Sequence, residues 1–144
     1  MNIDELIIHC SDTPEGRNDK AADIDRWHKQ RGFNKIGYHY VIDLDGTIEG
    51  GRPETEEGAH CRKGGHNKHS LGICYIGGRA ADNKTPKDTR TPAQKKALLQ
   101  LLKHLLKKYP NATIHSHHDF DATKTCPNFD ATAEYAELTN KPIN

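Results

Sequence analysis

Three side chains in this sequence have the chemistry of a catalytic zinc site. His9, His117 and Cys126 offer two imidazoles and one thiol, and imidazole and thiolate are the ligands that zinc prefers. A catalytic zinc ion takes three protein ligands and keeps a fourth position open. All three residues lie where the sequence predicts a strand end or a loop. Taken singly, each is more typical of a hydrogen-bonded structural residue, so it is the set of three that points to a metal.

Histidine and cysteine are frequent along the whole chain. There are ten histidines and four cysteines, namely Cys10, Cys61, Cys74 and Cys126. An even number of cysteines also permits two disulfides, which are typical of secreted proteins. The first residues show no basic stretch that leads into an apolar run, so we expect a product made in the cytoplasm with reduced thiols. Cys10 and Cys74 are then expected to be small buried side chains, and no role follows for Cys61.

The size and charge of the chain exclude several classes of function. Its 144 residues have the length of one domain, so residues 1–144 are predicted to fold as one unit. The 21 lysines and arginines balance 20 aspartates and glutamates, whereas surfaces for nucleic acid or anionic lipid carry an excess of basic charge. The longest apolar-rich stretch, over 97–106, is too short and too polar to cross a membrane. We therefore expect neither nucleic acid nor membrane as a partner.

The elements that must position these side chains include several short strands. Apolar runs predict strands over 6–8, 71–76 and 113–117. Asp45-Gly46, between two β-prone segments, predicts a hairpin. The first of these strands leads directly into His9, and the last of the three leads to His117.

Two helices and a shorter third are predicted between and after these strands. Segment 21–31 has its apolar residues on one face and stops at Gly32, as an amphipathic helix does. A longer helix begins at Thr91, because Thr-Pro-Ala-Gln supplies an N-cap, a proline at the first helical position and a glutamine that bonds back to the cap. Pro110 ends it, and a last short helix is predicted over 130–138. Each of the two longer helices carries one histidine that we expect at the surface, His28 and His104.

Five short motifs give the chain a family resemblance. In order they are Ile8-His9-Cys10-Ser11, Gly37-Tyr38-His39-Tyr40, Asp45-Gly46-Thr47, Ser70-Leu71-Gly72-Ile73 and Lys124-Thr125-Cys126-Pro127. Together they resemble the zinc-dependent N-acetylmuramoyl-L-alanine amidases, the family that includes phage T7 lysozyme and the peptidoglycan recognition proteins. The resemblance spans residues 6–129. It implies a mixed α/β fold with a central mixed β-sheet flanked by helices, a Zn2+ cofactor, and hydrolysis of the amide between N-acetylmuramic acid and L-alanine in peptidoglycan.

The resemblance also implies which residues bind the zinc. His9 matches the first histidine ligand of the family, and Cys126 matches the cysteine ligand. For the second histidine, the family's usual spacing to the cysteine selects His118, whereas the alignment of the preceding strand selects His117. We choose His117, with one residue inserted over 121–123, because a loop accepts an insertion more easily than a strand accepts a one-residue slip.

Five further residues match catalytic or groove positions of the family. Tyr38 matches its catalytic tyrosine and can orient the attacking water. Lys124 matches a lysine that some of these amidases place beside the zinc, where it can stabilise the oxyanion of the intermediate. The segment that borders the substrate groove in the relatives contains the residues that we predict to contact substrate, His60, Asn67 and His69.

The sequence leaves two other functions and the site of action open. Some members of this family bind peptidoglycan without cutting it, but these have typically lost the cysteine that Cys126 supplies here. A partner-binding role, like the inhibition of RNA polymerase by T7 lysozyme, would depend on surface residues that one sequence does not identify. We expect a monomer that reaches the cell wall by phage lysis or secretion, or that acts on cytosolic muropeptides.

Overall fold

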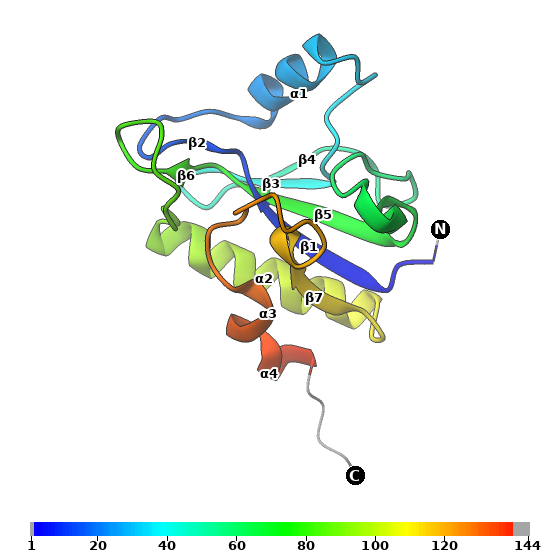
Figure 1. The fold of residues 1–144 in the computed structure, drawn as a ribbon. Helices are drawn as coiled ribbons and strands as arrows, with labels where there is room; N and C mark the ends of the chain where they lie inside the picture. Colours follow the sequence, from blue (N-terminus) through cyan, green and yellow to red (C-terminus); the bar gives the residue numbers. More distant parts are fainter. Residues whose placement is uncertain (1, 140–144) are drawn as a thin grey trace.

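A five-stranded mixed sheet forms the centre of the computed structural model, which describes residues 2–139 (Figure 1). Its strands, in spatial order, are β4 (Ile48–Gly50), β3 (Tyr40–Ile42), β5 (Ser70–Tyr75), β1 (Glu5–Cys10) and β7 (Thr113–Ser116). β1 is parallel to both β5 and β7, and β3 is parallel to β5, whereas β4 pairs with β3 in the antiparallel direction. Beyond the ends of β1 and β5, the chain forms a small parallel pair of β2 (Thr13–Pro14) and β6 (Gly78–Arg79). The expected mixed α/β fold is confirmed.

Helices cover both faces of this sheet. Helix α2 (Pro92–Lys108) lies along one face and α1 (Ala21–Gln30) lies over the other, as Figure 1 shows. The short helices α3 (Ala131–Glu134) and α4 (Ala136–Thr139) follow the last strand. Within residues 2–139, no helix has both the length and the apolar character that crossing a membrane requires.

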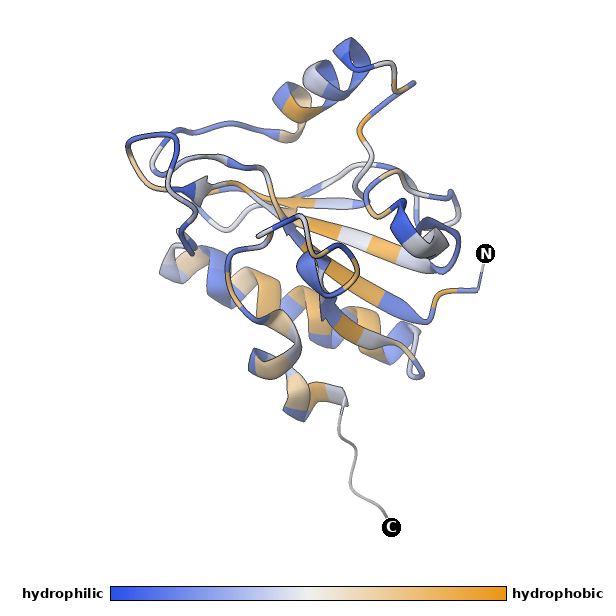
Figure 2. Cartoon of the chain, in the orientation of Figure 1, coloured by the Kyte–Doolittle hydropathy of each residue, from blue (hydrophilic) through white to orange (hydrophobic). Residues whose placement is uncertain are grey.

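The strand residues alternate between these two faces. Leu6 and Ile8 of β1 belong to the buried cluster that includes Leu98 and Leu102 of α2. In the hydropathy view, apolar colour follows the central strands and runs along α2 (Figure 2). The alternate residues of β1, Ile7 and His9, point to the opposite face. His9 therefore faces the side of the sheet on which α1 lies.

One glutamine docks the start of α2 onto two strand ends. The Thr91 hydroxyl accepts a hydrogen bond from the Gln94 amide, and the Gln94 side-chain oxygen accepts one from the Thr91 amide, which confirms the predicted capping box. Gln94 is fully buried, and its side-chain nitrogen donates to the carbonyls of Ile42 (3.2 Å) and Ile76 (3.0 Å). The cap therefore fixes both the helix and its position on the sheet.

A buried arginine holds the C-terminal helices against the body of the protein. The Arg90 side chain is 1% exposed and pairs with the carboxylates of Asp88 (2.9 Å) and Glu134 (2.7 Å). It also donates to the Tyr135 hydroxyl and lies 3.4 Å above the ring of Phe129. Because all its polar partners are in place, this buried charge is compensated.

The predicted elements are largely present, although several bounds differ; the strands predicted over 6–8 and 71–76, for example, are Glu5–Cys10 and Ser70–Tyr75. The helices at 21 and 91 and the Asp45-Gly46 hairpin are confirmed. The strand predicted over 113–117 ends at Ser116, and His117 begins the 3-10 helix η2 (His117–Asp119). The helix predicted over 130–138 is broken at Tyr135, which caps α3.

The prediction that His28 lies at the surface is wrong. Its side chain is buried, and its Nδ1 accepts a hydrogen bond from the Gly37 amide at 2.9 Å. The segment after α1 folds back over the helix, and the Phe33 ring lies 4.8 Å from the His28 ring. His104, in contrast, is exposed on α2 as expected.

Candidate active site

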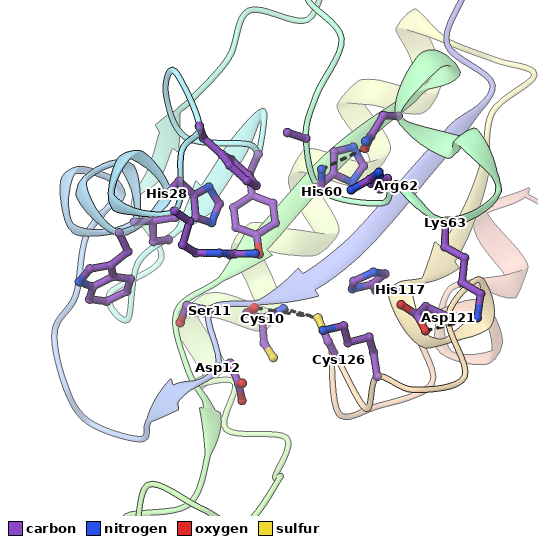
Figure 3. Close-up of a pocket in the computed structure, with 18 of the residues that line it drawn as sticks. Cys10, Ser11, Asp12, His28, His60, Arg62, Lys63, His117, Asp121 and Cys126 are labelled. Atoms are coloured by element: carbon purple, nitrogen blue, oxygen red, sulfur yellow. Dashed lines mark hydrogen bonds and ion pairs between the residues drawn. The ribbon is translucent and has the colours of Figure 1, made fainter.

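His9, His117 and Cys126 converge at one edge of the central sheet. His9 lies near the carboxyl end of β1, and His117 follows β7 directly. Because these two strands are parallel neighbours, their carboxyl ends lie at the same edge. The ligand atoms of the three side chains all lie within 4.8 Å of one another, and Figure 3 shows His117 and Cys126 side by side.

The two adjacent histidines have different surroundings. The His117 ring lies 4.4 Å from the His9 ring, measured between centroids. His118 turns to the other side, where its Nδ1 lies 3.2 Å from the Thr125 carbonyl oxygen and its Nε2 lies 3.7 Å from an Asp119 carboxylate oxygen. The structure thus brings His117, rather than His118, to the side chains of His9 and Cys126.

A chain of hydrogen bonds orients His9. Its Nε2 lies 2.9 Å from Nδ1 of His60, and Nε2 of His60 lies 3.2 Å from the Ser70 hydroxyl. Burial lowers the pKa of both histidines well below the usual range, and neighbouring imidazoles lower it further, so both rings are neutral at pH 7. If each Nε2 carries the proton, His60 accepts from His9 and donates to Ser70, and Nδ1 of His9 keeps a free lone pair. This is the tautomer that a metal ligand needs.

Two glycines make room for the His60 ring. A Cβ atom on Gly72 would lie 2.5 Å from Cγ of His60, and one on Gly58 would lie 2.6 Å from its Cδ2. The Asn67 side-chain oxygen accepts from the amides of His60 (2.9 Å) and Cys61 (2.7 Å), which fixes the backbone there. Sequence reasoning missed that Ser70 and Gly72 support His9 through His60, although both lie in the Ser-Leu-Gly-Ile motif.

Cys126 is partly buried, and its sulfur has a hydrogen-bond donor. The Cys10 amide donates to its Sγ at 3.1 Å (Figure 3). Burial raises the pKa of the Cys126 thiol well above its usual range, so the thiolate forms readily only beside a cation. All four cysteines are free thiols, as expected for a protein without disulfides.

These three side chains fit zinc by their chemistry. Two neutral imidazoles and one thiol that a cation can ionise make up a set of two nitrogens and one sulfur, which suits this metal. His117 and Cys126 border a cavity, while His9 is buried behind them. The cavity leaves a side open to substrate, as a catalytic site requires.

A cavity of about 800 Å³ opens next to these residues. Its walls come from α1, from the segment that contains the 3-10 turns η1 (Lys63–His69), and from the loop before Cys126. Charged side chains of both signs line it: Arg31, Arg62, Lys63, Lys124, Asp12 and Asp121. The size suits an extended polar ligand, because ligand pockets typically measure about 300–1,000 Å³.

Most of the other predicted site residues also border this cavity. Tyr38 lies between His9 and His28, with ring centroids 5.0 and 5.5 Å away, and burial raises its pKa, so it remains a phenol at neutral pH. Lys124 is exposed at the rim. The cavity is also lined by His60 and Asn67. His69 is not among its lining residues.

The comparison with known proteins agrees with this geometry. The N-acetylmuramoyl-L-alanine amidase family matches residues 1–129. The endolysin of Escherichia phage T7 is 42% identical over 130 residues, which cover 90% of this chain and 83% of the endolysin. The N-acetylmuramoyl-L-alanine amidase LysC from Clostridium intestinale has a solved structure that superposes with a TM-score of 0.79 at 32% identity, covering 98% of this chain and 88% of that one.

A second solved structure extends the likeness beyond phage and bacteria. Drosophila PGRP-LB superposes with a TM-score of 0.77 at 27% identity and covers 99% of this chain and 85% of that one. Family match, close relatives and fold all point the same way. The chain belongs to the N-acetylmuramoyl-L-alanine amidase family.

Proposed function

We propose that this amidase holds one zinc ion through His9, His117 and Cys126 and hydrolyses peptidoglycan there. The observation that carries the proposal is the convergence of three ligand atoms within 4.8 Å beside a cavity. The family to which the chain belongs cleaves the amide between N-acetylmuramic acid and L-alanine. We therefore assign the activation of that amide to this ligand set.

The residues around the ligands have distinct tasks in this proposal. A zinc ion held there supplies Lewis acidity toward the amide carbonyl and the attacking water. Tyr38 orients that water, because its phenol is protonated at neutral pH and borders the cavity. The Lys124 ammonium stabilises the negative charge that develops on the former carbonyl oxygen. His60 acts as a positioning residue, since it holds the tautomer of His9.

The cavity walls complement a peptide that carries carboxylates. Arg31, Arg62 and Lys124 line the cavity with positive charge, and arginine forms paired hydrogen bonds with carboxylate groups. Asn67 borders the same wall, where its side-chain oxygen is already engaged by two backbone amides. We therefore propose that Asn67 and His60 shape the groove, whereas the basic side chains contact the stem peptide. His69 is not among the residues that line the cavity, so this proposal gives it no contact with substrate.

Metal analysis of two neighbouring variants tests the ligand set. We expect His117→Ala to lose one equivalent of zinc per chain relative to wild type, because it removes one of three ligands. His118→Ala serves as the matched control and should keep its zinc, since its ring points away. Bound zinc is measured by atomic absorption after dialysis against metal-free buffer. Loss of zinc in His118→Ala with full retention in His117→Ala would show that the ligand assignment is wrong.

A further inference from the structure

We propose a second zinc site, formed by Glu5, His66 and His69, at the other end of β1. One ligand atom from each of these side chains lies within 4.8 Å of the other two. Glu5 begins β1, near whose opposite end His9 lies, and the two histidines belong to η1. The site is thus separate from the proposed catalytic zinc and does not depend on it.

The charge balance around Glu5 points to a cation. Its side chain is only 14% exposed. Among residues 2–139, its ion-pair partners are three histidines: His66 at 2.7 Å, His69 at 3.3 Å and His115 at 3.9 Å. A half-buried carboxylate with neither lysine nor arginine beside it is poorly compensated when these imidazoles are neutral. A divalent cation would supply the missing charge.

The donor set selects zinc among common divalent cations. Two imidazoles and one carboxylate form a set that zinc accepts readily, whereas calcium and magnesium prefer oxygen ligands alone. Two more potential ligands border the set, His115 at 3.9 Å from a Glu5 carboxylate oxygen and Asp4 at 2.6 Å from Nδ1 of His69. Binding would replace the present hydrogen bonds of His66 to Glu5 and of His69 to Asp4.

The ligands are already held near the required positions. The His66 ring stacks on Phe120 with centroids 3.8 Å apart and an interplanar angle of 21°. The main chain of the strand is also tied to η1, because the Asp4 amide donates to the His69 carbonyl. The conformational cost of ordering these side chains around a metal ion is therefore small.

A zinc ion here would stabilise one wall of the cavity. His66 and His69 flank Asn67, whose side chain binds the amides of His60 and Cys61. The turn also contains Gly64 and Gly65, both with positive φ, and none of the residues of η1 is buried. Linking η1 to β1 through a metal would restrict this segment, so we assign the site a structural role.

The test removes the catalytic site first and then asks whether zinc still binds. In a His117→Ala/Cys126→Ser background, only one proposed catalytic ligand remains. Equilibrium dialysis against Zn2+ should still find one equivalent per chain. Zn2+ at about one hundred times its Kd should raise Tm by about 5–10 °C. Adding His66→Ala and His69→Ala should abolish both the bound zinc and the shift in Tm.

Two further variants keep the test decisive. His104→Ala removes an exposed histidine of α2 and should change neither value. Glu5→Gln keeps the size of the side chain but not its charge, and should weaken zinc affinity at least tenfold if the folded state is unchanged by circular dichroism. Absence of a zinc equivalent in the first background, or its persistence after both histidines are removed, would overturn the proposal.

Discussion

Two of the three proposed zinc ligands are oriented by a neighbouring group. His60 holds the ring of His9, and the Cys10 amide points at the sulfur of Cys126. Such support reduces the rearrangement that metal binding requires, because the donor atoms are already aimed. At this scale, the site consists of its ligands and of the residues that fix their direction.

Removing the two proposed catalytic groups should separate chemistry from metal binding. We expect Tyr38→Phe and Lys124→Ala to keep bound zinc and Tm, since neither residue is a ligand. Each should lower kcat on purified sacculi by about 10²-fold, because the group acts in the transition state. Lys107→Ala, exposed on α2 and not among the residues that line the cavity, is the control. Wild-type rates in either of the first two variants would exclude that residue from the mechanism.

The hydrogen-bond chain through His60 makes a second prediction for single residues. His60→Ala should weaken zinc affinity by about 10–100-fold, because His9 loses the partner that selects its tautomer. His60→Asn should recover much of that loss, since the Asn side-chain oxygen can accept where Nδ1 accepts now. Competition with a chromogenic chelator measures both affinities. Equal affinity in His60→Ala and wild type would contradict the positioning role.

Local signals were sufficient to predict the helices and the hairpin. The capping residues at Thr91 and the Asp45-Gly46 turn act through neighbours in sequence. The helix start and the hairpin can therefore be predicted without knowledge of the tertiary fold. The pair of β2 and β6 was not predicted, because two-residue strands carry no periodicity and exist only through pairing across 65 residues or so of chain. His28 was misjudged for the same reason, since its partner Gly37 belongs to a segment that folds back.

The candidate site residues also divide into those that sequence motifs predict and those whose roles depend on tertiary contacts. The ligand set followed from motifs that the family shares, and the choice of His117 over His118 followed from strand geometry. The tasks of His60 and Ser70 depend on side chains that meet only in the folded protein, so no spacing in the sequence reveals them.

The contact between α2 and the sheet can be weakened at one position. Gln94→Ala should reduce the free energy of unfolding by about 3 kcal/mol, because the carbonyls of Ile42 and Ile76 lose their donor in a buried place and the helix loses half its capping box. Lys96→Ala, on the exposed face of α2, should change it by less than about 0.5 kcal/mol. Urea titration checks both. A Gln94→Ala variant as stable as Lys96→Ala would mean that the helix docks by its leucines alone.

Across the whole molecule, buried histidines make stability sensitive to acid. Burial lowers the pKa of His9, His28, His39 and His60, and for His28 the value falls to about 4. An imidazole with a lower pKa in the folded state than in the unfolded state favours folding while it is neutral. Its contribution is complete above the unfolded value of about 6.5 and is lost as the pH falls toward 4.

His28 offers a direct measurement of this effect. Between pH 7 and pH 5, His28 becomes protonated in the unfolded chain but stays neutral in the folded protein. This difference should lower the unfolding free energy of wild type by about 2 kcal/mol. His28→Asn keeps an acceptor for the Gly37 amide but does not titrate. With both proteins free of metal, the unfolding free energy of the variant should therefore fall by correspondingly less over that range. His104→Asn, exposed on α2, should follow wild type. Parallel urea curves for His28→Asn and wild type at both pH values would contradict the prediction.

The order of the strands also determines when the enzyme becomes active during its own synthesis. His9 is synthesised before β7, His117 and Cys126, and β7 is an edge strand that completes the sheet. A nascent or truncated chain that lacks this segment has one of the three proposed ligands and no closed site. The proposed ligand set therefore makes hydrolysis depend on the strand of the sheet that is synthesised last.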